Sequence, residues 1–136
     1  GVAIVDKVRV DHQDKPVIKQ IIGDYYGKNV LMVDDEIATG GTLIEAADFL
    51  KKNGAKKIIA AAVHPIFSET AVERLVNSSI EKVIVANTVP VEEKVAGHPS
   101  KFEILDVAPL FSKAISAIHN GNSLSKLFPK SVRRKG

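Results

Sequence analysis

Apolar residues are grouped along the chain in short runs rich in Val and Ile, and amphipathic stretches separate most of these runs. Such runs predict buried β-strands, which we place at residues 2–5, 30–33, 58–63, 83–85 and 104–107. Strands that alternate with helices are typical of an α/β fold. We therefore expect a mainly parallel sheet flanked by helices on both faces.

The clearest helix is predicted over residues 42–53. Its apolar residues recur at the spacing of one helical face, at Leu43, Ala46, Ala47 and Leu50. Thr42 and Glu45 have the spacing of a capping box, which predicts the start of the helix. Gly54 can adopt the left-handed conformation that ends a helix, so the pattern predicts both ends.

Two further helices follow. The first begins after Ser68, which can cap it, and should bury Ala71, Val72, Leu75 and Val76. The second has Pro109 in its first turn and ends at Asn120 and Gly121. It should bury Phe111, Ala114, Ile115 and Ile118. The polar residues 10–15 lack any period and predict a mobile loop.

The composition narrows the class of protein. The chain has 136 residues, 45% of them apolar, and no cysteine. This excludes disulfides, thiolate metal sites and a cysteine nucleophile. The four histidines show no metal-site spacing, and we assign no residue as a metal ligand. No apolar run approaches the roughly 20 residues of a membrane span, and no signal peptide is recognisable. A cytoplasmic enzyme or binding domain fits best, with no membrane partner.

The net charge of +3 arises at the end of the chain. Five basic residues and no acidic residue lie in the last eleven positions, which leaves 14 basic and 16 acidic residues elsewhere. We interpret residues 129–136 as a basic tail exposed to solvent. Few aromatic residues are present to stack on bases, so we expect no nucleic-acid partner.

The candidate chemistry lies in residues 30–42. Four apolar residues lead into Asp34 and Asp35, and the segment Thr39-Gly40-Gly41-Thr42 opens the predicted helix. Two glycines allow a tight turn whose N–H groups can surround one oxyanion, and the helix N-terminus adds positive charge. The threonines add hydroxyl donors. The two carboxylates can accept hydrogen bonds from vicinal hydroxyls or help to hold Mg²⁺.

Each of these features also has a purely structural explanation. Two glycines can simply form a turn, the acids can end a strand, and a threonine can cap a helix. All of them in this order favour a phosphate site suited to a phosphorylated sugar. The segment has neither the Gly-Lys-Ser/Thr of a Walker A loop nor the Gly-x-Gly-x-x-Gly of a dinucleotide site.

The same residues resemble a known signature. An apolar strand, Asp34-Asp35, three residues and then Thr39 to Thr42 are similar to the signature of type I phosphoribosyltransferases and of ribose-phosphate pyrophosphokinases. Later segments resemble the carboxyl-terminal half of the pyrophosphokinases, namely residues 62–68, 71–75, 87–90, 107–110, 118–121 and 123–128. The resemblance covers almost the whole chain. It implies a type I phosphoribosyltransferase-like domain over residues 1–128.

The resemblance implies a reaction in which the diphosphoryl group of MgATP moves to C1 of ribose 5-phosphate, giving phosphoribosyl diphosphate and AMP. By the same resemblance, the 5-phosphate of the substrate would be bound by Thr39, Gly40, Gly41 and Thr42. The ribose hydroxyls would be bound by Asp34 and Asp35. Lys7 and Arg9 match the family's Asp-Lys-x-Arg element and would act on the transferring diphosphate. The resemblance also implies Mg²⁺ as cofactor and a homo-oligomer.

Two departures keep other functions open. Ala38 stands where many family members carry an acidic residue, and some adenine phosphoribosyltransferases share the Ala-Thr-Gly-Gly-Thr form. A purine-type phosphoribosyltransferase is therefore one alternative, and a non-catalytic regulatory relative is another. The family's amino-terminal half, which supplies most of the ATP site, is missing from the sequence. We expect an incomplete domain of a longer enzyme, inactive by itself.

Overall fold

The computed structural model describes residues 4–9, 16–68 and 70–128, and for residues 4–9 and 16–21 it describes the backbone only. The chain divides into two compact units, Gly1–Leu105 and Asp106–Gly136. The loop predicted at residues 10–15 and the basic tail at residues 129–136 lie outside the described residues.

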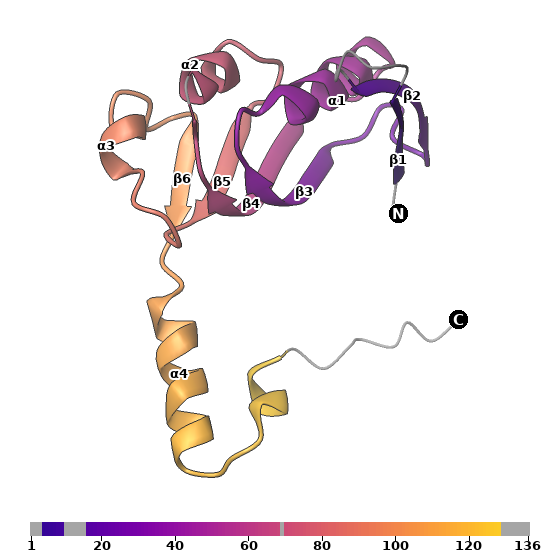
Figure 1. The fold of residues 1–136 in the computed structure, drawn as a ribbon. Helices are drawn as coiled ribbons and strands as arrows, with labels where there is room; N and C mark the ends of the chain where they lie inside the picture. The colour runs from indigo at the N-terminus through magenta and orange to yellow at the C-terminus, as the bar shows by residue number, and fades with distance from the viewer. Residues whose placement is uncertain (1–3, 10–15, 69, 129–136) are drawn as a thin grey trace. The chain divides into compact units, whose positions relative to one another are not determined.

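The first unit is built on a four-stranded parallel sheet with the strand order β3-β4-β5-β6 (Figure 1). The strands are β3 (Val30–Ile37), β4 (Ile58–Pro65), β5 (Lys82–Ala86) and β6 (Phe102–Leu105). Three helices connect them in turn, α1 (Gly41–Lys52), α2 (Ala71–Val76) and α3 (Glu92–Val95). Four of the five predicted runs overlap these strands, so the predicted parallel sheet is confirmed. Helix α3 was not predicted.

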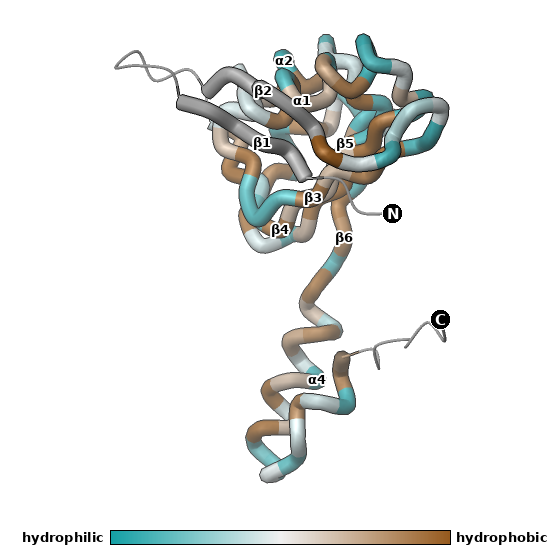
Figure 2. Tube along the Cα trace, turned by 90° about the vertical axis from the view of Figure 1, so that its right-hand side faces the viewer, coloured by the Kyte–Doolittle hydropathy of each residue, from teal (hydrophilic) through white to brown (hydrophobic). Residues whose placement is uncertain are grey.

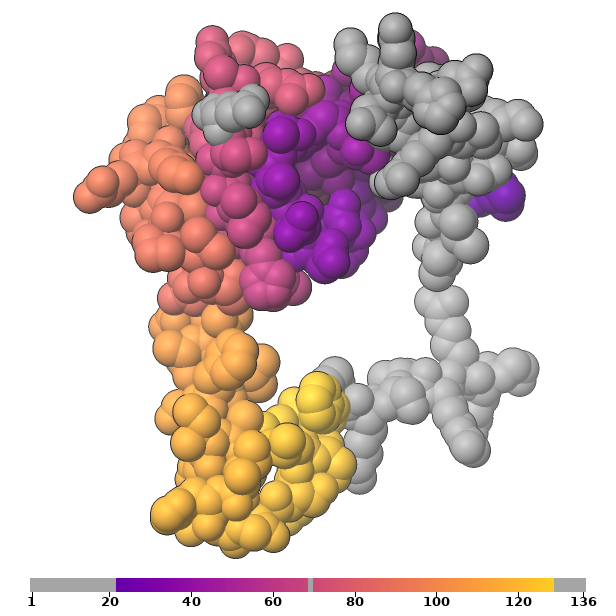
Figure 3. Space-filling model, in the orientation of Figure 1, coloured from indigo at the N-terminus to yellow at the C-terminus, as the bar shows by residue number. Residues whose placement is uncertain are grey.

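The helices cover one face of this sheet. Each connection steps to the next strand in the same direction, and right-handed crossovers then place successive helices on the same side. The other face is open: Leu31 and Val33 of β3 are 61% and 73% exposed, and Val63 of β4 is also exposed. In Figure 3 the violet part of the chain, which includes β3, reaches the surface. We expected helices on both faces of the sheet, but the described helices cover only one. The reason is that the strand order never reverses, so no connection crosses to the other face.

Helix α1 confirms its predicted buried face. Leu43, Ala46, Ala47 and Leu50 are all buried and pack over the sheet. The predicted capping box is wrong, because Gly40 adopts a left-handed conformation (φ 71°) and lets the helix begin at Gly41. Thr42 consequently lies inside the first turn and cannot cap it.

The C-terminus of α1 confirms the prediction for Gly54, which has φ 92°. The Gly54 N–H donates to Lys51 O at 3.2 Å, and the Ala55 N–H donates to Leu50 O at 3.0 Å. This pair of bonds is a Schellman motif, which satisfies two of the last carbonyls of the helix. Ala55 and Leu50 are both buried, so the motif fixes where the chain enters β4.

The predictions for the other two helices are confirmed in part. Helix α2 buries Ala71 and Leu75, but its N-cap is Thr70 and the predicted cap at Ser68 is wrong. In the second unit, helix α4 (Ala108–His119) has its proline in the first turn, as predicted. Figure 2 shows apolar and polar segments alternating along α4. Within this unit the predicted burial is not observed: Phe111, Ile115 and Ile118 are exposed. Among the described residues of the unit, α4 packs on the short 3₁₀ helix Leu124–Leu127, which is too small to cover its apolar face.

The N-terminal segment differs most from the prediction. β1 (Ile4–Arg9) pairs antiparallel with β2 (Pro16–Ile22) in a separate two-stranded sheet. Of the run predicted at residues 2–5, the described residues Ile4 and Val5 therefore belong to a hairpin and not to the parallel sheet. β2 was not predicted. It contacts α1, so the hairpin is joined to the rest of the first unit through that helix.

Replacing Gly54 with Ala should lower the free energy of unfolding by about 1–2 kcal/mol, because a side chain is strained at φ 92°. The new Cβ would also lie 2.6 Å from the ring of Tyr26, which is exposed and can move aside. Chemical denaturation measures the effect. Gly97→Ala is the control: nothing lies within 4 Å of its Cβ position, and its stability should change by less than about 0.5 kcal/mol. Equal effects of the two substitutions would contradict the assignment.

Candidate functional site

Asp34 and Asp35 lie in the last four residues of β3, which continues to Ile37. Both side chains are exposed. The Asp35 N–H donates to Asp34 Oδ1 at 3.0 Å, and the Glu36 N–H donates to Asp35 Oδ1 at 2.9 Å. A hydrogen bond with the Asp34 side chain, followed by bonds from backbone N–H groups, lowers the pKa of Asp35. Asp35 is therefore ionised at neutral pH and can accept hydrogen bonds from hydroxyl groups.

The turn between β3 and α1 directs its carbonyl groups toward the rest of the protein. Each of the four consecutive carbonyls of residues 37–40 accepts a hydrogen bond. The bonds are Phe67 N–H to Ile37 O (3.0 Å), Ser68 N–H to Ala38 O (3.1 Å), Arg74 Nη1 to Thr39 O (3.1 Å) and Ile44 N–H to Gly40 O (3.0 Å). A trans peptide places its N–H opposite its C=O. The N–H groups of residues 38–41 are thus directed away from these partners, as in an anion-binding turn.

The predicted loop residues differ in their environments. Gly40 is buried and left-handed, and it leads directly into the 12-residue α1. Thr39 is exposed, and its Oγ1 lies 3.5 Å from the Gly41 N–H. Thr42 is half-buried in the first turn. The first N–H groups of a helix have no carbonyl partners within it, so this turn combines backbone donors that the helix does not use with the positive end of the α1 dipole.

The loop that follows β4 supports this turn. Phe67 has φ 46°, which is unusual for a residue with a side chain, and it is only 2% exposed. Its ring packs edge-on against Phe102 with the centroids 5.6 Å apart. Lys94 Nζ donates to Ile66 O at 3.2 Å and to Phe67 O at 3.1 Å. Packing and hydrogen bonds together hold the strained backbone that supplies two of the four donors to the turn.

Sequence analysis missed this supporting role of Phe67 and also the contact of Arg74. Neither residue belongs to a motif that signals it, because both act through pairings between segments about 30 residues apart. The Ser68 amide was missed for the same reason.

His64 lies beside the two acids at the same edge of the sheet. It pairs in register with Glu36, and its Nδ1 lies 3.0 Å from Thr88 Oγ1. The Thr88 hydroxyl donates its proton to Val63 O at 2.7 Å, so it can only accept from His64. This assigns the proton of the neutral imidazole to Nδ1 and leaves Nε2 as an acceptor. We give His64 no catalytic role.

Lys7 and Arg9 lie on β1, where they pair in register with Ile18 and Pro16. The backbone shifts register between Asp6 and Lys7. Only the backbone of this segment is described, so the structure does not test a role for these two residues at the turn. Their proposed role stays a prediction from the sequence.

The described residues contain no group of three or more His, Cys, Asp or Glu side chains that could hold a metal ion. Asp34 and Asp35 are the predicted site's only carboxylates. Mg²⁺ is commonly bound by one or two carboxylates together with substrate phosphates, so this donor pair fits an ion that arrives with a phosphorylated substrate. None of the described helices is long and apolar enough to span a membrane.

These features place the chain among α/β proteins with a parallel sheet, a class in which ligands generally bind beyond the carboxyl ends of the strands. The comparison with known families is more specific. The family described as the phosphoribosyl synthetase-associated domain matches residues 3–129. The chain belongs to this family.

Two similar proteins share the name ribose-phosphate pyrophosphokinase. A ribose-phosphate pyrophosphokinase of Aquifex aeolicus is 48% identical over 128 residues, which cover 94% of this chain and 40% of the relative. One from Caldanaerobacter subterraneus subsp. tengcongensis is 45% identical over 126 residues, covering 93% of this chain and 39% of the relative. The chain thus spans about two fifths of the length of these relatives.

A solved structure agrees with this result. The crystal structure of phosphoribosylpyrophosphate synthetase from Mycobacterium smegmatis is similar with a TM-score of 0.70 and 36% sequence identity. The match covers 76% of this chain and 34% of that chain. The expected resemblance to the pyrophosphokinases and the α/β fold are therefore confirmed.

Replacing Thr88 with Val should release the His64 ring, because valine offers no acceptor to Nδ1–H. The ¹⁵N chemical shifts of the imidazole should report Nδ1 protonation in the neutral wild-type ring and a mixture of both tautomers in the variant. Thr42→Val is a control that removes a hydroxyl from α1 without touching His64. A wild-type ring protonated at Nε2 would contradict the assignment.

Proposed function

We propose that this chain is the ribose 5-phosphate-binding part of a ribose-phosphate diphosphokinase. The observation that carries the proposal is the turn at residues 37–40, where each of the four carbonyls accepts a hydrogen bond from the protein and each peptide N–H therefore points away from that bond. Two acids precede this turn at the sheet edge, in a chain that belongs to the phosphoribosyl synthetase-associated domain family. The relatives' shared name supports the same activity.

In the proposed complex, the 5-phosphate accepts hydrogen bonds from the N–H groups of Gly40 and Gly41 and from the hydroxyls of Thr39 and Thr42. The positive end of the α1 dipole favours the same anion. Asp34 and Asp35 accept hydrogen bonds from the ribose hydroxyls. These contacts at both ends of the sugar fix the direction of C1, which is where the reaction occurs.

The reaction is a displacement at phosphorus. The C1 hydroxyl oxygen of ribose 5-phosphate forms a bond to the β-phosphorus of ATP and loses its proton. The bond between that phosphorus and the oxygen bridging to the α-phosphate breaks, so AMP leaves and phosphoribosyl diphosphate remains. Negative charge develops on the leaving oxygen and on the transferring group, and we assign Lys7 and Arg9 to neutralise it.

Mg²⁺ enters this scheme as part of the substrate MgATP, where it supplies charge neutralisation on the phosphate oxygens. Asp34 and Asp35 are the residues of this chain that could contact it. From the sequence we further propose a cytoplasmic homo-oligomer that takes ribose 5-phosphate and ATP as substrates and binds no nucleic acid.

The binding site is tested by the double substitution Asp34→Asn with Asp35→Asn in the full-length protein. Asparagine keeps the size of each side chain, but it removes the negative charge and replaces one of the two acceptor oxygens with an NH₂ donor. Affinity for ribose 5-phosphate, measured by calorimetry, should fall at least about 10-fold. Glu45→Gln is the control, because it removes one exposed carboxylate from α1, and its affinity should not change. Unchanged binding in the double variant would overturn the assignment of the acids.

The reaction is tested by following AMP in a mixture of the full-length protein, MgATP and ribose 5-phosphate. AMP should form in equal amount to phosphoribosyl diphosphate. Lys7→Ala and Arg9→Ala should each lower kcat by about 10²–10³-fold, the size of effect expected when one group that stabilises the transition state is removed. Lys52→Ala, an exposed cation at the far end of α1, should leave kcat unchanged. Release of pyrophosphate from phosphoribosyl diphosphate and adenine, without AMP formation from ATP, would favour a phosphoribosyltransferase.

A further inference from the structure

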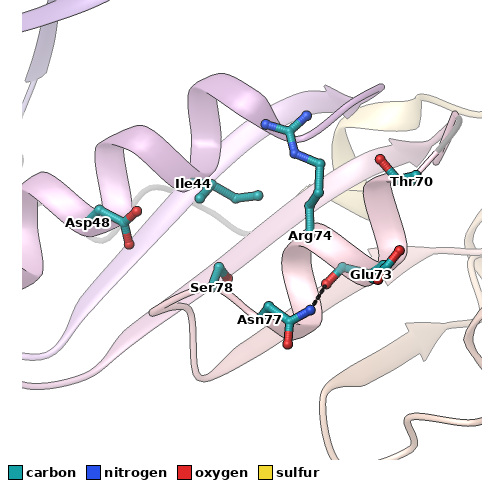
Figure 4. Close-up of a pocket in the computed structure, with 7 residues that line it drawn as sticks. All are labelled: Ile44, Asp48, Thr70, Glu73, Arg74, Asn77 and Ser78. Carbon is teal, nitrogen blue, oxygen red and sulfur yellow. Dashed lines mark hydrogen bonds between the residues drawn. The ribbon is translucent and has the colours of Figure 1, made fainter.

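An open groove of about 460 Å³ lies between α1 and α2, beside the turn at residues 37–40. Figure 4 shows Arg74 extending from α2 past Ile44, with its guanidinium turned away from Asn77 and Ser78. None of the site residues discussed above lines this groove except Arg74, which connects it to the turn. The proposed mechanism does not use this side chain.

Arg74 holds one peptide group of the turn in place. Its Nη1 donates to Thr39 O at 3.1 Å. The other three carbonyls of residues 37–40 are held by backbone N–H groups, so Thr39 O is the one whose partner is a side chain. The peptide that joins Thr39 to Gly40 carries this carbonyl on one side and the Gly40 N–H on the opposite side. Fixing the carbonyl therefore fixes the direction of the Gly40 N–H.

The surroundings of the guanidinium suit this contact. A Cβ built on Gly41 would lie 3.3 Å from Arg74 Nη2, so the missing side chain of Gly41 leaves room for the guanidinium against the turn. Among the residues that the structure describes, no carboxylate forms an ion pair with Arg74. Among the described residues, the guanidinium donates its hydrogen bond to the turn, and a bond from a charged donor is stronger than one between neutral groups.

We propose that Arg74 is a positioning residue for the sugar-phosphate site. It holds the Thr39–Gly40 peptide so that the Gly40 N–H is directed at the 5-phosphate. Because the guanidinium lies on the carbonyl side of this peptide, it acts through the turn and does not touch the ligand. The inference rests on the proposed function for its ligand, but the orientation of the turn can be tested without any ligand.

The test compares Arg74→Met with the wild type in the full-length protein. Methionine keeps an unbranched apolar stem beside Ile44 and removes both the donor and the charge. Affinity for ribose 5-phosphate, measured by calorimetry, should fall about 5- to 30-fold. Hydrogen exchange of the peptide spanning residues 37–43, measured by mass spectrometry without ligand, should become faster. Arg74→Lys retains a charged donor and should recover part of both effects, whereas Lys52→Ala should change neither.

The outcomes separate the alternatives. Weaker binding together with faster exchange in Arg74→Met, with partial recovery in Arg74→Lys, supports the positioning role. Weaker binding with unchanged exchange means that Arg74 contacts the phosphate directly, and it overturns the proposal. Unchanged binding and unchanged exchange also overturn it.

If the wild type does not bind ribose 5-phosphate, the proposed function fails, and the exchange comparison still decides whether Arg74 orders the turn. If Arg74→Met does not fold, Arg74→Gln, whose shorter neutral side chain lacks the guanidinium, provides both measurements, and wild-type values for it in both would overturn the proposal.

Discussion

The candidate site depends on the orientation of a few peptide groups between β3 and α1. Four successive carbonyls, from Ile37 to Gly40, are bonded to partners in the protein. Because a peptide group is rigid, binding its oxygen on one side leaves its N–H on the other. An anion site made of backbone groups needs no charged side chain in contact with the ligand, but it does need these planes to be held in advance of binding.

Three of the four partners that hold these planes come from the segment that follows the neighbouring strand, and the fourth, Ile44, lies in α1 itself. Phe67 and Ser68 lie just after β4, and Arg74 lies one turn into α2. Parallel strands place the turn after β3 beside the turn after β4, so the topology of the sheet brings these segments together. The buried Phe67 ring and the contacts of Lys94 then stabilise a backbone conformation that would otherwise be unfavourable. The packing of the core therefore also fixes the geometry of the candidate site.

Sequence patterns predicted the parts of this structure that depend on local periodicity. The buried face of α1, the left-handed Gly54 and four strands all follow from spacing and residue type. The start of α1 was wrong because a left-handed Gly40 let the helix begin before Thr42. β2 was missed because Lys19 and Gln20 interrupt its apolar residues. Arg74 and Phe67 depend on contacts between distant segments, for which the local pattern carries no signal.

The open face of the sheet has a practical consequence. Leu31, Val33 and Val63 form apolar surface on neighbouring strands, and contiguous surface of this kind favours aggregation in water. A preparation of these 136 residues alone should therefore lose solubility as its concentration or the salt concentration is raised, and it should bind fluorescent dyes that detect exposed apolar groups. Detergent at low concentration, or polar substitutions at the exposed apolar positions of β3, would then be the first means of keeping the protein soluble.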